Sequence, residues 1–203
     1  MSDPLFFSKF GFFINGDFLE AQLCRNLCTE MCRSEQPLAT VIDGYTLTQR
    51  EKRSVRLTRQ AEVSASSVFL MKKLLHNLKP QVEDHFSLTL SGCEIPQFLV
   101  YQPGDFFLPH TDGGDEPDKP DYFRKRRLSA VIFLSDETGE PQPEGYCGGK
   151  LTFYGLIDDA RWERYGFPLT GKKGLLVVFR SEVLHEVTAI THGTRYSIVS
   201  WFF

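Results

Sequence analysis

Two histidines and one aspartate in this chain are residue types that bind a transition metal. His110 and Asp112 form an H-x-D pair at the end of an extended apolar stretch, and His185 lies far downstream in another strand-like run. Alternate side chains of a strand point to the same side, so His110 and Asp112 can reach one ion if the strand extends that far. Two histidines and a carboxylate can hold one face of an octahedral iron(II) and leave the other face open for chemistry.

Arg195 follows His185 inside a further apolar run and would place a fixed cation beside such a metal. A guanidinium binds a carboxylate through two parallel hydrogen bonds, so this position predicts an anionic co-substrate. Each residue also has an ordinary interpretation. The chain has five histidines, so one H-x-D pair arises easily by chance, and His110 could simply bond its loop neighbours. The metal hypothesis therefore depends on the combination with His185 and Arg195.

The composition predicts one ordinary globular domain. A chain of 203 residues is too short for two full domains, and 41% hydrophobic with 24% charged residues is typical of a globular protein. A net charge of −3 gives no reason to expect nucleic acid or an anionic membrane as a partner. Asp3, Lys9 and Asp17 interrupt the apolar N-terminus, so we expect neither a signal peptide nor a membrane span.

The five cysteines form no C-x-x-C pair. Cys24, Cys28 and Cys32 have the i, i+4, i+8 spacing of one helix face, which favours small apolar packing residues over metal ligands or a disulfide framework. This usage predicts a reducing cytoplasm.

Hydrophobic periodicity predicts helices first and strands afterwards. A helix is expected over 17–33 with Asp17 as its N-cap, and a second over about 63–78, ending at Pro80. Between them, the basic segment 49–59 is expected to be a surface loop with solvated charges. Short runs rich in valine, isoleucine, phenylalanine and tyrosine predict strands at 97–102, 128–135, 150–154, 175–180, 184–190 and 195–203.

This order of elements predicts an α+β fold, a β-sandwich or jelly roll buttressed by N-terminal helices. We expect residues 1–203 to form a single domain, with mainly helical support in 1–96 and a jelly-roll core in 97–203. Two loops, 113–122 and 136–147, are long enough to act as lids or substrate-binding surfaces, although both could be plain surface loops.

Further motifs accompany the H-x-D pair. They are Tyr101-x-x-Gly104, Gly148-Gly149-Lys150-Leu151-x-Phe153, His185-Glu186-Val187, and Gly193-Thr194-Arg195-Tyr196-Ser197-Ile198 with Trp201-Phe202. In order and spacing, 99–203 resembles the catalytic domain of the prolyl 4-hydroxylase family, most of all the intracellular and bacterial protein prolyl hydroxylases. These enzymes are iron(II)- and 2-oxoglutarate-dependent dioxygenases on a double-stranded β-helix.

The resemblance implies that His110, Asp112 and His185 bind iron(II), with 2-oxoglutarate and dioxygen as co-substrates and ascorbate as reductant. It implies that Arg195 pairs with the distal carboxylate of 2-oxoglutarate, with Tyr101 offering a hydroxyl and Ser197 assisting Arg195. Tyr101 could equally be a core aromatic.

For the substrate, the resemblance points to Arg126 or Arg127 and to Trp201. The two arginines could equally be solvated residues at the start of a strand, and Trp201 could equally be a core residue. Several relatives carry a second tyrosine on the strand after the basic residue, where this chain has Ile132-Phe133-Leu134, so the missing hydroxyl must come from elsewhere or be omitted.

The favoured function is therefore hydroxylation of a C–H bond, with a prolyl residue of a protein as substrate because long loops suit an extended peptide. A free amino acid or small metabolite remains the alternative within this class. A non-catalytic jelly-roll binding protein and a cupin-like metalloenzyme that is not an oxygenase remain alternatives outside it. Nucleic-acid demethylation would need a further arginine downstream, and Arg195 is the last in the chain.

Overall fold

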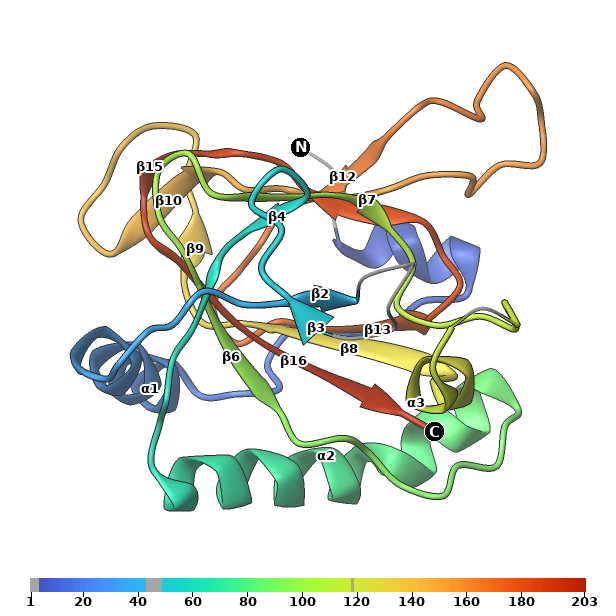
Figure 1. The fold of residues 1–203 in the computed structure, drawn as a ribbon, viewed down its shortest axis with the longest axis horizontal. Coiled ribbons are helices and arrows are strands. Elements are labelled where there is room, and N and C mark those ends of the chain that lie inside the picture. Colours follow the sequence, from blue (N-terminus) through green and yellow to red (C-terminus); the bar gives the residue numbers. More distant parts are fainter. Residues whose placement is uncertain (1–3, 43–48, 118) are drawn as a thin grey trace.

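Two facing antiparallel sheets form the centre of the molecule (Figure 1), in a computed structural model that describes residues 4–42, 49–117 and 119–203. The larger sheet has the order β1 (Phe13–Asn15), β13 (Leu176–Arg180), β8 (Leu128–Phe133), β16 (Arg195–Phe202), β6 (Gln97–Tyr101) and β5 (Arg59–Gln60). The smaller sheet has the order β12 (Phe167–Leu169), β11 (Leu151–Phe153), β14 (His185–Val187), β7 (Phe106–His110) and β4 (Arg56–Leu57). The predicted α+β fold is confirmed.

Smaller elements flank these sheets. β15 (Ile190–Gly193), β10 (Gly145–Gly148) and β9 (Asp136–Glu137) form a three-stranded sheet, and β2 (Val41–Ile42) pairs with β3 (Gln49–Arg50). The helical elements are η1 (Pro4–Phe10), α1 (Ala21–Arg33), α2 (Ala65–Phe86) and α3 (Asp121–Lys125). In the part of the chain that the structure describes, no helix has the length and apolarity needed to cross a membrane.

Strand alternation gives the larger sheet two different faces. Ile132 of β8, Ile198 of β16 and Val100 of β6 pack on the outer face against α1 and α2, which Figure 1 shows lying along this sheet. Their neighbours Phe133 and Tyr101 point the other way, into an aromatic core between the two sheets. Because the side-chain period of a strand is two, Arg195, Ser197 and Trp201 fall on this inner face as well.

Both predicted helix boundaries need correction. α1 begins at Ala21 instead of Asp17, because the N–H of Leu19 bonds the carbonyl of Gly174 and holds this stretch out of a helix. α2 runs through Pro80 to Phe86, because Val82 and Phe86 continue its buried stripe. Pro80 is on the exposed side, where water can reach the carbonyl that loses its helical partner.

The prediction of a solvated loop over 49–59 holds for the exposed residues 51–54 and is wrong for the strand residues that follow them. β4 pairs with β7 and β5 pairs with β6, so this segment passes from the edge of the smaller sheet to the edge of the larger one. Arg59 forms an ion pair of 2.6 Å with the buried Asp105. This segment has little apolar periodicity of its own. It is held in place by pairing with strands that are distant in the sequence.

The six predicted strands are confirmed, as β6, β8, β11, β13, β14 and β16. The two predicted loops contain more structure than expected: α3 begins within the first, and β9 and β10 lie at the ends of the second. Asp118 of the first loop lies outside the described residues.

Candidate active site

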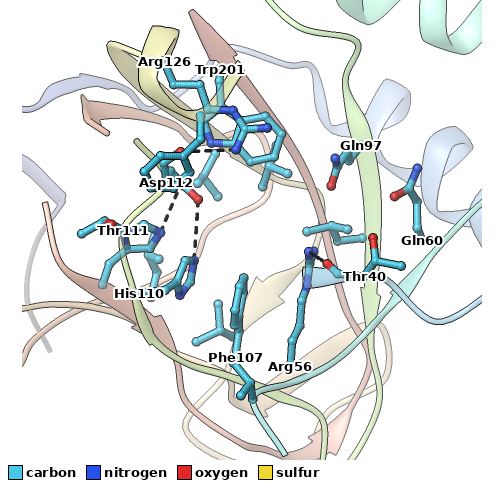
Figure 2. Close-up of a pocket in the computed structure, with 18 of the residues that line it drawn as sticks. Thr40, Arg56, Gln60, Gln97, Phe107, His110, Thr111, Asp112, Arg126 and Trp201 are labelled. Atoms are coloured by element: carbon cyan, nitrogen blue, oxygen red, sulfur yellow. Dashed lines mark hydrogen bonds and ion pairs between the residues drawn. The ribbon is translucent and has the colours of Figure 1, made fainter. Parts of the chain in front are cut away.

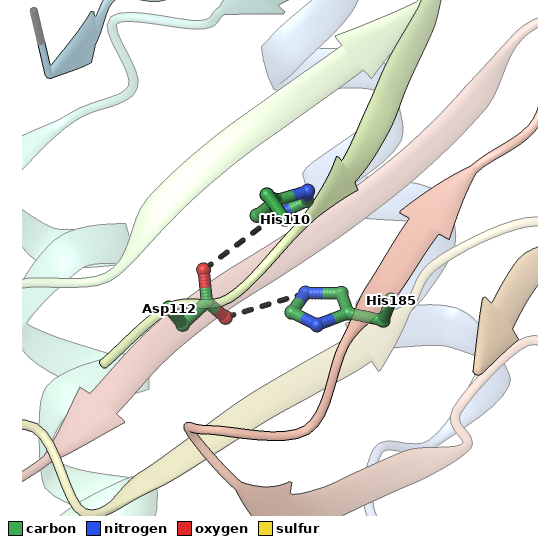
Figure 3. Close-up of side chains that lie close together, drawn as sticks. All are labelled: His110, Asp112 and His185. Atoms are coloured by element: carbon green, nitrogen blue, oxygen red, sulfur yellow. Dashed lines mark ion pairs between the residues drawn. The ribbon is translucent and has the colours of Figure 1, made fainter. Parts of the chain in front are cut away.

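The structure brings His110, Asp112 and His185 together, with ligand atoms that all lie within 4.8 Å of one another. His110 ends β7 and faces His185 of β14 across the ladder, and Asp112 follows just beyond the strand. As Figure 3 shows, both imidazoles turn toward the carboxylate. The Nε2 atoms of His110 and His185 lie 3.7 Å and 3.5 Å from the two oxygens of Asp112.

Backbone carbonyls fix which nitrogen of each imidazole is free. Nδ1 of His110 bonds the carbonyl of Leu108, and Nδ1 of His185 bonds the carbonyl of Val183, each at 2.8 Å. A carbonyl only accepts, so both Nδ1 atoms carry the proton and both Nε2 lone pairs face Asp112. Donation from the second ring nitrogen is the arrangement that orients metal-binding histidines.

The donor set fits ferrous iron, which binds imidazole and carboxylate together. Burial and the nearby His185 lower the pKa of His110. Burial acts to raise the pKa of Asp112, but the two histidines in their protonated forms and the charge of Arg126 together lower it to about 2. At neutral pH the carboxylate is therefore ionised and His110 neutral, the forms in which these side chains bind a metal.

Asp112 is held in place by its backbone. Its N–H and that of Gly113 both bond the carbonyl of Ser181, at 2.9 Å and 3.1 Å. A Cβ at position 113 would lie 2.7 Å from the carbonyl oxygen of Arg126, so only glycine allows this approach. The predicted strand geometry thus holds for His110, while Asp112 is oriented by the turn that follows.

Arg195 lies fully inside the barrel beside the predicted partners. It faces Tyr101 across the β16–β6 ladder, and its guanidinium carbon lies 5.1 Å from the Tyr101 ring centre and 5.0 Å from that of Phe133. Nη1 donates to the hydroxyl of Ser197 at 2.9 Å. The buried Nε has no hydrogen-bond partner within the described residues. An unused buried donor is costly unless a ligand satisfies it.

Tyr146 of β10 is a residue that the sequence analysis missed. Its side chain is 1% exposed, and its hydroxyl is a second buried polar group without a partner in the described structure. Tyr146 and Arg195 pack on the same glycine, since a Cβ at Gly149 would lie 3.4 Å from one and 3.2 Å from the other. Burial raises the pKa of Tyr146 to about 12 against the opposing charge of Arg195. A neutral hydroxyl therefore sits where Phe133 supplies none.

A cavity of about 290 Å³ connects these groups. Its lining includes the three ligand residues, Tyr101 and Arg195, and also Arg126 and Trp201 (Figure 2). The Arg126 guanidinium lies 3.7 Å from the Trp201 ring centre and bonds both carboxylate oxygens of Glu94, at 2.6 Å and 2.8 Å. Arg127 is exposed and does not line the cavity.

Arg56 lines the cavity, unlike Tyr146, and the sequence analysis missed it as well. It belongs to the segment expected to be solvated, yet its side chain points inward from β4, as Figure 2 shows. Its only sequence signal is the alternation Val55-Arg56-Leu57, which is too short to predict a strand.

Comparisons with known proteins agree with this geometry. The model of the 2OG-Fe(II) oxygenase superfamily matches residues 96–203, more than half of the chain. The PKHD-type hydroxylase YbiX of Escherichia coli O1:K1 is 27% identical over 170 residues, which cover 83% of this chain and 70% of the relative. YbiX of Shigella dysenteriae serotype 1 matches with the same identity and coverage.

Solved structures agree as well. A prolyl-4-hydroxylase of Pseudomonas putida has a TM-score of 0.66 at 26% identity, covering 97% of this chain and 94% of that one. A prolyl hydroxylase of Trichoplax adhaerens, solved with a hypoxia inducible factor peptide fragment, shares the fold, with a TM-score of 0.72 at 15% identity over 97% and 85% of the two chains. The predicted family is confirmed. The chain belongs to the 2OG-Fe(II) oxygenase superfamily and is a prolyl hydroxylase-like iron(II)- and 2-oxoglutarate-dependent dioxygenase.

Proposed function

We propose that this enzyme hydroxylates a prolyl residue of a protein or peptide, using iron held by His110, Asp112 and His185. The observation that carries the proposal is the placement of these three ligands and the buried Arg195 around one cavity. The similarity to the Pseudomonas putida prolyl-4-hydroxylase along nearly the whole chain supports the choice of proline.

The three ligand residues would hold iron on one side only. When bound, iron(II) supplies the oxygen activation that couples decarboxylation of 2-oxoglutarate to hydroxylation of a C–H bond. His110 and His185 keep their Nε2 lone pairs aimed at the metal through their Nδ1 bonds to carbonyls. Asp112 contributes the negative charge and is kept in position by the Ser181 carbonyl.

Three residues would bind 2-oxoglutarate, and Ser197 would orient one of them. Arg195 pairs with its distal carboxylate, using the buried Nε and the guanidinium edge that Ser197 orients. Tyr146 donates its unpartnered hydroxyl to the same carboxylate and so replaces the tyrosine that Phe133 lacks. Tyr101 lines the passage from Arg195 toward the metal ligands and offers its hydroxyl there.

Arg126 and Trp201 would contact the substrate at the rim. Glu94 fixes the plane of the Arg126 guanidinium against Trp201, and the N–H groups that Glu94 does not use can bond a peptide carbonyl. Ascorbate would serve as reductant for iron, and a reducing compartment such as the cytoplasm would suit both iron(II) and the five free cysteines.

The test is succinate formation from 2-oxoglutarate with iron(II), ascorbate and oxygen, with and without proline-containing peptides. We expect turnover that rises when a suitable peptide is added, with a hydroxyproline product detected by mass. Slow turnover with no response to any peptide would contradict the prolyl proposal and favour a small-molecule substrate. Failure of the iron-loaded protein to bind 2-oxoglutarate would contradict the assigned residues and favour a non-catalytic binding protein.

A further inference from the structure

Arg56 is a cation in the cavity that forms no salt bridge with a described residue, although Asp112 and Tyr101 lie near enough to favour its charged form. Its guanidinium carbon lies 4.7 Å from the Phe107 ring centre, and Nη1 donates to the carbonyl of Thr40 at 3.0 Å. Its Nε is buried and has no hydrogen-bond partner among the described residues. The part of the chain that the structure describes offers it no ion pair, since neighbouring Arg59 takes Asp105.

The other arginines of the cavity are already engaged. Arg126 is neutralised by the two bonds to Glu94, and Arg195 is assigned to the distal carboxylate of 2-oxoglutarate. Asp112 is the only carboxylate among the described lining residues, and the iron site uses it. The exposed Lys52 adds further positive charge to the lining, while the half-buried Lys119 is paired with Glu116 at 3.6 Å. Cationic side chains therefore outnumber carboxylates in the described lining, and Asp112, the carboxylate that acts on Arg56, belongs to the iron site.

The surroundings of Arg56 suit a carboxylate. In Figure 2, Arg56 lies with Thr40, Gln60 and Gln97 on the side of the cavity away from Asp112 and Arg126. The side-chain amides of Gln60 and Gln97 can bond the atoms around an anion. Burial lowers the pKa of Arg56, but an arginine remains protonated at any physiological pH. A partly buried guanidinium with free donors is stabilised most by a carboxylate, which accepts two of its hydrogen bonds.

We propose that Arg56 binds a carboxylate of the substrate that is hydroxylated. This rests on the proposed function, in which 2-oxoglutarate directs one carboxylate to Arg195 and the other to the metal, leaving neither for Arg56. The carboxylate can belong to an acidic side chain next to the target proline or to the α-carboxyl group of a free amino acid. Arg56 is thus a specificity-determining residue on a different side of the cavity from the iron ligands.

Binding measurements on the full chain loaded with Mn(II) and 2-oxoglutarate under anaerobic conditions test this directly. Calorimetry would compare two pairs of probes: a proline peptide flanked by aspartate with its asparagine counterpart, and L-proline with L-prolinamide. We expect one pair to show on the order of tenfold tighter binding for the carboxylate form, as a charge-assisted hydrogen bond predicts. Preference within the first pair identifies a side-chain carboxylate, and preference within the second identifies an α-carboxylate.

Arg56→Gln should abolish this preference while 2-oxoglutarate affinity stays as in the wild type, which also reports that the variant is folded. Arg56→Lys should retain part of the preference, and Arg53→Gln, a change at a neighbouring exposed arginine, should retain all of it. The inference is overturned if neither carboxylate probe binds more tightly than its uncharged counterpart. It is also overturned if Arg56→Gln weakens the binding of 2-oxoglutarate instead. Failure of the proposed function looks different: without the proposed co-substrate site the wild type would not bind 2-oxoglutarate at all, and a preference for L-proline alone would contradict the peptide substrate while keeping Arg56 as the carboxylate site.

Discussion

The two sides of the cavity are built in different ways. The ligand side, formed by His110, Asp112, His185 and Arg195, projects from strands paired on both sides or from the turn beside them. The edge side, formed by Thr40, Arg56 and Gln60, lies on or next to the two-residue strands β4 and β5, each at the edge of its sheet. The chemistry is thus placed on the most constrained backbone and the proposed substrate recognition on the least constrained.

This difference has a physical consequence. Residues in paired central strands open only with much of the sheet, whereas edge segments with few ladder bonds open locally at lower cost. Substitutions on the ligand side should therefore strongly reduce the binding of metal and co-substrate. Changes on the edge side should affect substrate preference or stability without touching the co-substrate.

The largest effect should come from Asp112→Ala. Removing the carboxylate takes away one of three ligands and the only negative charge of the set, so iron binding and turnover should be abolished. Bound iron and succinate formation measure this, and circular dichroism should show an unchanged fold. The exposed Asp115→Asn serves as control and should behave as the wild type. Full iron-dependent turnover in Asp112→Ala would refute the ligand assignment.

Arg195→Gln should be next in size. A hydrogen bond to a charged group contributes roughly 1.5–3 kcal/mol, so loss of the guanidinium should weaken the binding of 2-oxoglutarate by on the order of tenfold or more. Calorimetric titration of the Mn(II)-loaded protein measures it, with the exposed Arg180→Gln as control. An unchanged affinity would mean that Arg195 only supports the barrel.

The sequence could predict the ligand side because its residues stand in strands long enough to show a period. Arg195 and Ser197 are two positions apart in β16, so their common face follows from spacing, whereas the place of Tyr101 beside them is implied only by the resemblance. His185 could be matched to His110 because both lie next to apolar runs that predict strands.

The rest could not be predicted, for two different reasons. Arg56 is ordered by pairing between β4 and β7, a contact between residues about fifty positions apart in a segment with no apolar period. Tyr146 stands between Gly145 and Gly148 in a stretch that resembles a loop, and its role depends on packing against Arg195. Both side chains are placed by tertiary contacts that leave no local pattern.

Tyr146→Phe should have a smaller effect than loss of Arg195. It removes one neutral donor without opening a cavity, so 2-oxoglutarate affinity should fall roughly three- to tenfold, as a single hydrogen bond of about 1 kcal/mol or slightly more predicts. Calorimetry would compare it with Tyr154→Phe, whose hydroxyl bonds Glu186 away from Arg195. The double variant Phe133→Tyr with Tyr146→Phe returns a hydroxyl from β8 and should recover part of the affinity. Wild-type affinity in Tyr146→Phe would exclude the hydroxyl from the site.

The smallest effect is expected from Thr58→Val, which should lower the stability of the edge side without changing 2-oxoglutarate binding on the ligand side. Thr58 lies fully buried between β4 and β5, where its hydroxyl donates to the carbonyl of Val100 at 2.9 Å and its own carbonyl accepts from Ala39. Valine keeps the shape and loses the side-chain bond, so the free energy of unfolding should fall by about 1 kcal/mol. Because β6 remains paired with β16, Tyr101 and Arg195 keep their register, and 2-oxoglutarate affinity should not change. Urea denaturation and calorimetry on the same preparation measure both quantities. A loss of co-substrate affinity as large as that of Tyr146→Phe would show that the edge side and the ligand side are mechanically coupled.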